Sequence, residues 1–227
     1  MIIGNGLVAS EFKKQESKFK NCLIFAAGVS NSKEVDDSEF LRDKNLLISA
    51  LQKHKDLKFV YISTILAGYV DNAYYRHKLE MEELVKNYAN SYVIFKVPQL
   101  VGRGGNSNTL LNYFKSRIIN EEPVPVYHDS KRSLMDILDL TNMVYYFLNI
   151  VDRETIIIPG IEILKATDLC KMVAATLGKP ANIVEVFMEE NNDWAINRLS
   201  PQILKDLGIQ TQNYTETLLK KYLKKCH

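Results

Sequence analysis

The fold is indicated by the stretch Leu57-Lys-Phe-Val-Tyr-Ile-Ser-Thr-Ile-Leu-Ala-Gly-Tyr-Val-Asp-Asn-Ala-Tyr-Tyr-Arg-His-Lys78. It opens with an apolar run that predicts a buried strand ending at the hydroxyls of Ser63 and Thr64. It leads into a helix, because the apolar residues that follow recur at i, i+3, i+4 and i+7: Met81, Leu84, Val85 and Tyr88. A strand, a hydroxyl pair, a loop and a helix therefore follow one another.

Tyr74 and Lys78 are one helical turn apart, so the helix places them on the same face. A nearby ammonium favours the phenolate and lowers the pKa of a tyrosine. A tyrosine of this kind can give or take a proton at a carbonyl or an alcohol, and the hydroxyl of Thr64 could orient the same oxygen. Tyr-x-x-x-Lys also arises by chance in a chain with 12 tyrosines. Its place after a strand favours a carbonyl–alcohol redox site.

Short apolar runs alternate with amphipathic patterns on both sides of this stretch. We expect strands at residues 1–3, 22–28, 59–64 and 91–97, and helices after residue 6, at 40–51 and after residue 73. This alternation predicts an α/β fold with a Rossmann-like parallel sheet and helices on both faces. Ligands of such sheets bind at the carboxyl ends of the strands.

Gly4, Gly6 and Ala9 fit the pattern Gly-x-Gly-x-x-Gly/Ala, in which the turn lets a pyrophosphate approach the backbone. The N–H groups at the start of the following helix can bind phosphates.

The amino-acid composition changes after Pro98, where a loop rich in glycine and asparagine begins. Helices are expected at 110–119, 140–150, 167–177 and 215–225, and strands at 124–127 and 155–158. We predict a cofactor-binding core at 1–150 that carries an insertion at about 98–131. Residues 151–227 then complete a small mixed C-terminal substrate lobe.

Composition excludes several function classes. A net charge of +2 gives no reason to expect nucleic acid or a membrane as a partner. The three cysteines, Cys22, Cys170 and Cys226, show no metal-site or disulfide spacing, so no metal is expected and the cytoplasm is the expected compartment. His54 and His77 are expected to be solvated, and Trp194 to be a packing residue.

Five segments in order resemble the extended short-chain dehydrogenase/reductase family, the NAD-dependent epimerase/dehydratase group that acts on sugar nucleotides. They are Ile24-Phe-Ala-Ala-Gly28, Val60-Tyr-Ile-Ser-Thr64, the Tyr74/Lys78 pair, Pro98-Gln-Leu-Val-Gly102, and Arg132-Ser-Leu-Met-Asp-Ile-Leu-Asp-Leu140.

The resemblance implies roles for individual residues. It makes Thr64, Tyr74 and Lys78 catalytic. It implies that NAD or NADP is held by Gly4, Asn5, Gly6, Leu7, Val8, Ala26, Ala27, Gly28, Tyr74, Lys78 and Pro98. It implies that a nucleotide-sugar substrate is contacted by Ser63, Gln99, Asn108 and Arg132, the last at the diphosphate, which suits a bidentate guanidinium.

The chain departs from the family pattern at three places. Its glycine motif is Gly-x-Gly-x-x-Ala, where the family usually has Gly-x-x-Gly-x-x-Gly. Only fifteen residues separate Gly6 from Cys22, where the family has a second strand, its helix and a third strand. The resemblance therefore implies a sheet shortened by two strands, and we expect a homodimer contact or a folded-back segment to cover its exposed first strand.

The acidic residue expected about 20 positions after the glycine motif, on the adenosine ribose, has no counterpart. Ile65 and Leu66 follow Thr64 where dehydratases carry Asp-Glu, and aliphatic side chains cannot do acid/base work. We expect a keto-sugar reductase; a sugar-nucleotide epimerase and a non-catalytic nucleotide-binding module are the alternatives.

Overall fold

The structure, a computed structural model, describes residues 1–104, 109–187, 192–196 and 199–224. It divides into two compact units, a first unit of Met1–Val97 with Ile137–Ile158 and a second unit of Pro98–Asp136 with Pro159–His227. The predicted insertion at about 98–131 is observed at 98–136, and the first unit ends at residue 158 instead of the predicted 150. Residues 151–158 belong to the first unit because strand β9 (Glu154–Ile157) pairs with strand β4 (Tyr92–Val97).

The first unit is built on one five-stranded sheet in the order β1-β2-β3-β4-β9, in which all neighbours are parallel. The other strands are β1 (Ile2–Ile3), β2 (Cys22–Phe25) and β3 (Lys58–Thr64). Ile24 of β2 lies opposite Ile2 on one side and Val60 on the other. The prediction of a parallel α/β sheet is confirmed.

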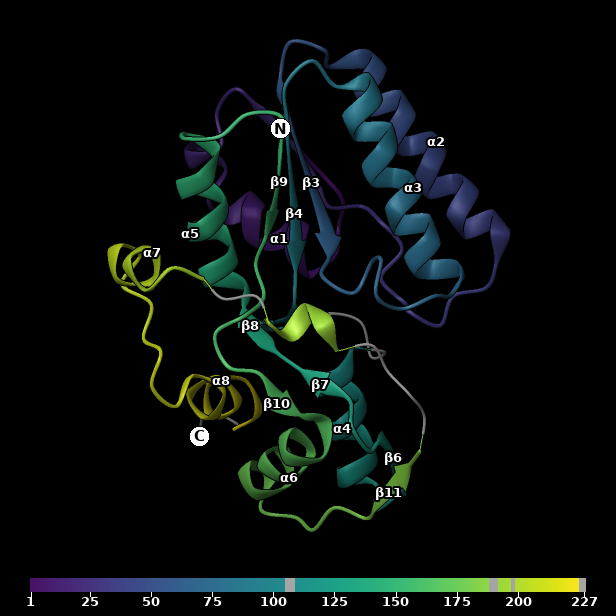
Figure 1. Cartoon of the computed structure of the whole chain (residues 1–227), viewed down its shortest axis with the longest axis vertical. Helices are drawn as coiled ribbons and strands as arrows, with labels where there is room; N and C mark the ends of the chain where they lie inside the picture. Colours follow the sequence, from purple (N-terminus) through teal and green to yellow (C-terminus); the bar gives the residue numbers. More distant parts are fainter. Residues whose placement is uncertain (105–108, 188–191, 197–198, 225–227) are drawn as a thin grey trace. The chain divides into compact units, whose positions relative to one another are not determined.

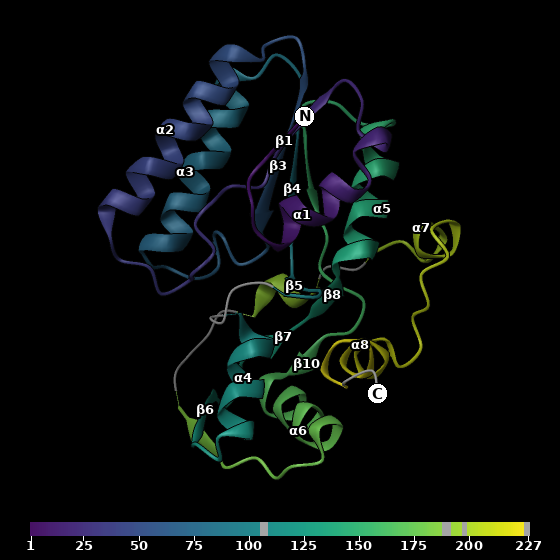
Figure 2. The same cartoon turned by 180° about the vertical axis from the view of Figure 1, so that it is seen from behind.

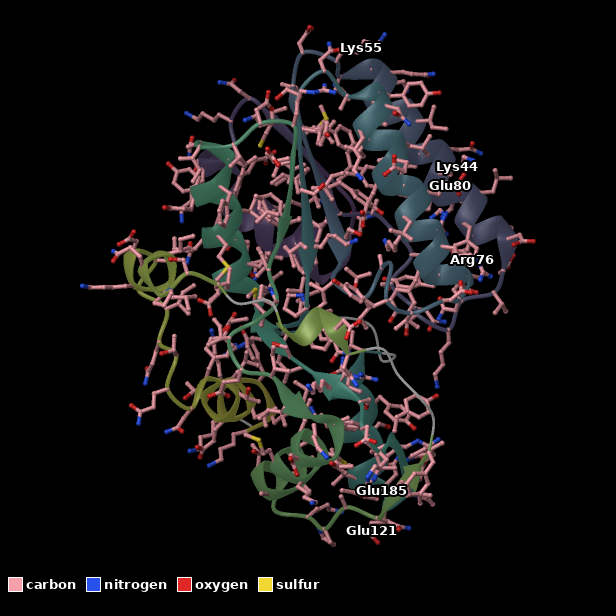
Figure 3. All side chains as sticks on the ribbon, viewed as in Figure 1. Lys44, Lys55, Arg76, Glu80, Glu121 and Glu185 are labelled. Carbon is pink, nitrogen blue, oxygen red and sulfur yellow. The ribbon has the colours of Figure 1, made fainter. Side chains whose placement is uncertain are left out.

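Helices cover both faces of this sheet. They are α1 (Leu7–Lys14), the short η1 (Glu16–Lys18), α2 (Asp37–Lys53), α3 (Ala73–Tyr88) and α5 (Ile137–Leu148). Helices α2 and α3 pack side by side on one face, and α1 and α5 lie on the other (Figures 1 and 2). Lys44 of α2 and Glu80 of α3 form an ion pair of 2.5 Å between the two helices (Figure 3).

The core under α2 and α3 explains their amphipathic patterns. Its fully buried side chains come from alternate positions of the strands and from one stripe of each helix, as the two periodicities require. They include Phe25, Phe59 and Tyr61 of the sheet, Leu47 of α2 and Met81 of α3.

The sheet is shorter than a complete dinucleotide-binding sheet. In the complete order, 3-2-1-4-5-6, the first strand lies in the middle. Here β1 is at the edge, and the chain passes from α1 through η1 directly to β2. The predicted loss of two strands is therefore observed.

The second unit contains three two-stranded sheets and four α-helices within the described residues. Strands β5 (Gln99–Val101) and β8 (Leu134–Asp136) pair in parallel, as do β6 (Val124–Tyr127) and β11 (Ile183–Val186), whereas β7 (Lys131–Arg132) and β10 (Leu164–Lys165) are antiparallel. The helices are α4 (Leu110–Ile119), α6 (Ala166–Leu177), α7 (Pro201–Asp206) and α8 (Tyr214–Leu223), with a short η2 (Asp193–Ile196).

Helix α6 starts one residue before the predicted 167–177, with Lys165 as its N-cap. Gly178 ends it in the left-handed conformation at φ 66°. Trp194 is buried, as expected for a packing residue. In the part of the chain that the structure describes, every helix is too short or too polar to cross a membrane.

Candidate active site

The start of helix α3 positions the Tyr74/Lys78 pair. Asn72 caps the helix by accepting a hydrogen bond from the backbone N–H of Tyr75 at 2.9 Å. The Nζ atom of Lys78 is buried, 5.5 Å from the ring centroid of Tyr74 and 3.5 Å from the hydroxyl of Tyr61. The structure thus brings the two predicted residues together on one helical face.

Lys78 is buried and Tyr74 is half-buried, and this reverses one expectation. Burial raises the pKa of Tyr74, and the neighbouring Tyr75 and Asp43 raise it further. Burial also lowers the pKa of Lys78, although the carboxylates of Asp43 and Glu82 oppose this shift. The expectation that Lys78 lowers the pKa of Tyr74 is therefore wrong for the protein without a ligand, because desolvation outweighs the ammonium. Tyr74 keeps its proton at neutral pH.

The two hydroxyls at the end of β3 have different environments. Oγ1 of Thr64 accepts a hydrogen bond from the N–H of Leu66 at 3.3 Å. Ser63, on the opposite face of the strand, is buried and donates to Glu82 at 2.5 Å. Glu82 also pairs with Lys96 at 3.4 Å. Ser63 is thus held by the Glu82–Lys96 pair, and its contact with substrate stays a prediction.

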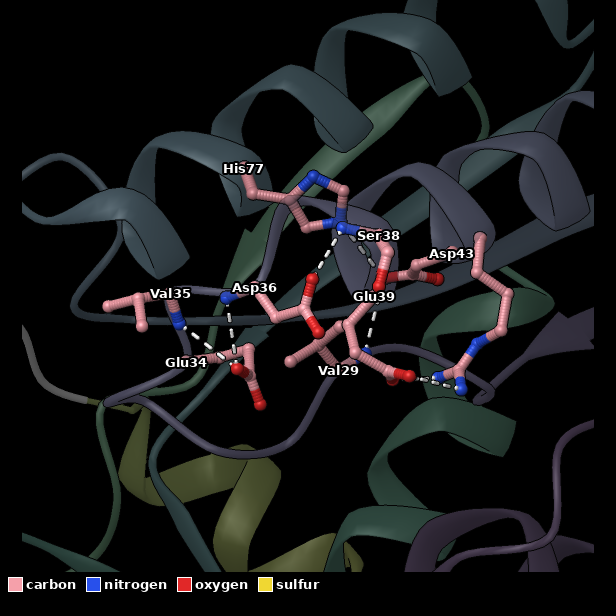
Figure 4. Close-up of polar contacts among 9 residues, drawn as sticks. Val29, Glu34, Val35, Asp36, Ser38, Glu39, Asp43 and His77 are labelled. Carbon is pink, nitrogen blue, oxygen red and sulfur yellow. Dashed lines mark hydrogen bonds and ion pairs between the residues drawn. The ribbon is translucent and has the colours of Figure 1, made fainter.

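The side chain of Asp43 is a buried carboxylate that sequence reasoning missed. Its Oδ2 accepts from the N–H of Val29 at 3.2 Å and lies 3.0 Å from Nε2 of His77 (Figure 4). Burial would raise the pKa of Asp43, but His77, the Lys78 ammonium and the Val29 N–H together hold it below its ordinary value. Asp43 is therefore a fixed negative charge beside Lys78.

His77 is buried rather than solvated, which corrects a second expectation. Helix α3 packs on α2, and the imidazole contacts the ring of Phe40 at 4.8 Å between centroids. A signal for Asp43 was present in the sequence, because it precedes Leu47, Ala50 and Leu51 at i+4, i+7 and i+8 and so falls on the buried stripe of α2.

Gly28 leaves the space that the Lys78 side chain occupies. A Cβ atom at this position would lie 2.6 Å from Nζ of Lys78 and 3.3 Å from Oδ2 of Asp43. Ala26 and Ala27 precede it directly after β2. The predicted small-residue segment therefore adjoins the Tyr74/Lys78 pair.

The glycine turn adjoins the same end of the sheet. Gly4 has φ +129°, and a Cβ there would lie 2.3 Å from the carbonyl oxygen of Ala26, so only glycine fits this approach. Gly6 is the N-cap of α1 and has no side-chain cap, and a Cβ there would meet nothing within 4 Å. Leu7 and Val8 form the first turn of α1. The uncapped N–H groups and the space beside Gly6 fit the diphosphate of a nucleotide cofactor.

The other predicted ligand contacts belong to the second unit. Pro98 is buried, and Gln99 opens β5, its buried Oε1 lacking a hydrogen-bond partner among the described residues. Nη1 of Arg132 donates to the carbonyl oxygen of Lys131 at 2.7 Å. Asn108 lies outside the described residues. The roles of these four residues stay predictions.

Taken together, a parallel sheet, a glycine turn after β1 and a tyrosine–lysine helix after β3 define a nucleotide-dependent α/β oxidoreductase. The NAD dependent epimerase/dehydratase family matches residues 26–158, more than half of the chain. The chain belongs to this family of NAD-dependent enzymes. The matched region begins after the glycine turn and includes Thr64, Tyr74 and Lys78.

Solved structures share the fold at low sequence identity. RMD from Pseudomonas aeruginosa, complexed with NADPH, matches with a TM-score of 0.72 and 15% identity, covering 96% of this chain and 95% of that one. UDP-glucuronic acid 4-epimerase from Bacillus cereus, in complex with UDP-glucuronic acid and NAD, gives 0.67 and 16%, covering 95% and 76%. UDP-glucose 4-epimerase from Thermus thermophilus, complexed with NAD, gives 0.67 and 15%, covering 97% and 82%. No curated protein sequence matches the chain.

Proposed function

We propose that this protein reduces a keto group of a sugar nucleotide, with NADH or NADPH as the electron donor. The observation that carries the proposal is the buried Lys78 ammonium against the Tyr74 ring, at the carboxyl end of a parallel sheet whose family is NAD-dependent. The nucleotide-sugar substrate is suggested by the named ligand of the B. cereus epimerase structure.

The reaction requires a proton donor at the carbonyl oxygen. When bound, reduced nicotinamide supplies the hydride that forms the new C–H bond. Tyr74 gives the hydroxyl proton to the oxygen, which becomes an alcohol, and later recovers a proton from solvent. Thr64 orients the oxygen, and Lys78 stabilises the phenolate that forms when the proton leaves.

The shortened sheet favours reduction over epimerisation. An epimerase must retain its cofactor through turnover, and the missing strands beyond β1 remove binding surface for the adenosine half. A reductase exchanges its cofactor in each cycle and tolerates looser binding. Epimerase activity remains the closest alternative, because the same three residues could serve it and two of the similar structures are epimerases.

The dependence on added cofactor separates these two activities. We expect the purified protein to convert a keto-sugar nucleotide only while NADH or NADPH is present, and to consume one reduced nicotinamide per product. An epimerase would interconvert sugar nucleotides through many turnovers without added cofactor. Such turnover would replace the reductase proposal.

The catalytic role of Tyr74 is tested by Tyr74→Phe. We expect a loss of about a hundredfold or more in kcat, the usual range for a missing general acid. Tyr88→Phe, at the exposed end of the same helix, is the matched control and should keep wild-type activity. If Tyr74→Phe binds cofactor and keeps full activity, Tyr74 is not the acid.

A non-catalytic nucleotide-binding module is the second alternative, and the shortened sheet is the observation that favours it. Binding of reduced nicotinamide without turnover of any sugar nucleotide would support it. We further propose that the protein works in the cytoplasm as a homodimer whose contact covers the free edge of β1, because an open edge invites pairing.

A further inference from the structure

We propose that the first unit binds only the nicotinamide nucleotide half of its cofactor, so that reduced nicotinamide mononucleotide is a hydride donor comparable to NADH and NADPH. This inference rests on the proposed function and specifies the chemical class of the cofactor. It follows from the contacts of the first unit, in which every residue is described.

The adenosine side of the site is the part that the fold lacks. In a complete sheet, the two strands beyond the first one and an acidic residue at the end of the second carry the adenosine ribose. Here β1 is the edge strand, and the eight-residue helix α1 connects through η1 to β2. No strand of the first unit lies beyond β1, so this chain itself has no strand end there to hold an adenosine ribose.

The nicotinamide side is retained and crowded. Lys78 lies beside Tyr61, the ring of Tyr74 and Gly28, and the carboxylate of Asp43 lies beside Gly28 as well. A cofactor whose nicotinamide reaches Tyr74 therefore contacts protein side chains at its nicotinamide end, and no strand of the first unit contacts its adenosine end. The binding free energy should come from that end and from the phosphate next to it.

Lys13 places a positive charge at the glycine turn. Its Nζ donates to the carbonyl oxygen of Gly4 at 2.7 Å and to Oδ1 of Asn5 at 3.2 Å, although Lys13 itself is in the last turn of α1. An ammonium held there, beside the uncapped N–H groups of α1, suits a phosphate group. A mononucleotide carries such a phosphate, so it keeps this contact without adenosine.

Two features predict that the protein binds NADH and NADPH with similar affinity. The absent acidic residue removes the usual preference for the free ribose hydroxyl of NADH, and no strand beyond β1 offers a group for the extra phosphate of NADPH. We therefore expect little difference between NADH and NADPH. Adenosine monophosphate, which has a phosphate but lacks nicotinamide, should bind much more weakly than any of the three.

Titration calorimetry on the purified full chain tests the inference through binding alone. We expect dissociation constants for NADH, NADPH and reduced nicotinamide mononucleotide that agree within about threefold. Lys13→Ala should weaken all three by about fivefold, the order expected for one exposed charge contact. Lys14→Ala is the matched control: this neighbouring lysine pairs with Glu11 at 2.8 Å and should leave binding unchanged.

The possible failures are distinguishable. If NADH or NADPH binds more than about tenfold tighter than the mononucleotide, the adenosine half is recognised and the inference is wrong, while the proposed function stands. Adenosine monophosphate that binds as well as NADH would overturn it equally. If none of the reduced nicotinamides binds, the proposed function itself fails.

Discussion

At the scale of single residues, the site depends on how one ammonium is held in a dry environment. Lys78 is surrounded by the hydroxyl of Tyr61, the ring of Tyr74 and the space left by Gly28. The negative charges of Asp43 and Glu82 favour the ammonium form of Lys78 and oppose the lowering of its pKa by burial. The position of Nζ is thus set by side chains from three elements.

The contact with Gly28 yields a prediction that separates position from folding. Gly28→Ala places a Cβ 2.6 Å from Nζ of Lys78, so the flexible end of the lysine must move. We expect kcat to fall by about tenfold to a hundredfold, as for other small misplacements of catalytic groups. The melting temperature should change little. Equal kcat in a folded variant would show that the position of Lys78 does not matter.

The lowered pKa of Asp43 predicts a pH dependence of stability. A carboxyl group with a folded-state pKa below its ordinary value of 3.8 stabilises the fold above that pH, and the contribution is lost as the pH falls through the folded-state pKa. Asp43→Asn keeps the size but removes the charge. We expect the variant to lose about 1–3 kcal/mol in the free energy of unfolding at neutral pH.

Denaturant titrations at several pH values check this prediction. As the pH falls below the ordinary value of 3.8, the free energy of unfolding should fall less steeply for Asp43→Asn than for the wild type, because the variant has one carboxyl fewer to protonate. Parallel curves for the two proteins would contradict the assigned pKa direction.

Residue-level features show where sequence reasoning ends. The spacing of Tyr74 and Lys78 was sufficient to place them on one helical face, but not to predict their protonation. Spacing says which groups are near, whereas the pKa depends on how much water burial removes. The burial of His77 became apparent only from the packing of α2 against α3, whereas Asp43 already fell on the apolar stripe of α2 in the sequence.

At the scale of elements, the β1–α1 turn contains two glycines with different tasks. Gly4 is required by the fold, because of its positive φ and the nearby carbonyl of Ala26. Gly6 is exposed and leaves open space at the start of α1. The first is a structural glycine and the second is available to a ligand.

Paired substitutions distinguish these tasks. Gly4→Ala should destabilise the protein by at least about 1–3 kcal/mol, the range for a strained backbone conformation. Gly6→Ala should unfold like the wild type but bind reduced nicotinamide nucleotides more weakly, because its Cβ occupies the space beside the α1 N-terminus. Thermal unfolding and calorimetry measure the two effects. Similar behaviour of both variants would refute the distinction.

Most elements followed from the sequence, since periodicity reports burial directly. Helix α4 and strand β6 have the predicted bounds, and α5 starts three residues earlier than predicted because Ile137 also packs in the core. The pairing of β9 with β4 could not be predicted from a short apolar run, because a parallel partner is chosen by the tertiary fold.

At the scale of the whole molecule, the shortened sheet leaves β1 with a free edge. Ile24 N–H donates to the carbonyl of Met1 and Ala26 N–H to that of Ile3, so the alternation of a strand turns the N–H and C=O of Ile2 outward. A second copy could pair with these groups. This is the physical basis of the proposed homodimer.

Ile2→Pro tests this contact, since proline removes the outward N–H while an edge strand tolerates it. Sedimentation velocity should show a dimer for the wild type and for the control Ile2→Val, and a monomer for Ile2→Pro. A wild-type monomer at micromolar concentration, or a dimer that is insensitive to Ile2→Pro, would rule out pairing through β1.

The central claim is that Tyr74 protonates a keto group while an exchangeable nicotinamide reduces it. The most direct measurement uses NADH or NADPH that carries deuterium at the transferable position, with mass spectrometry of the sugar-nucleotide product. The proposed reductase transfers the label to every product molecule that wild-type protein forms, and Tyr74→Phe forms little product. Product that accumulates without the label would contradict the account.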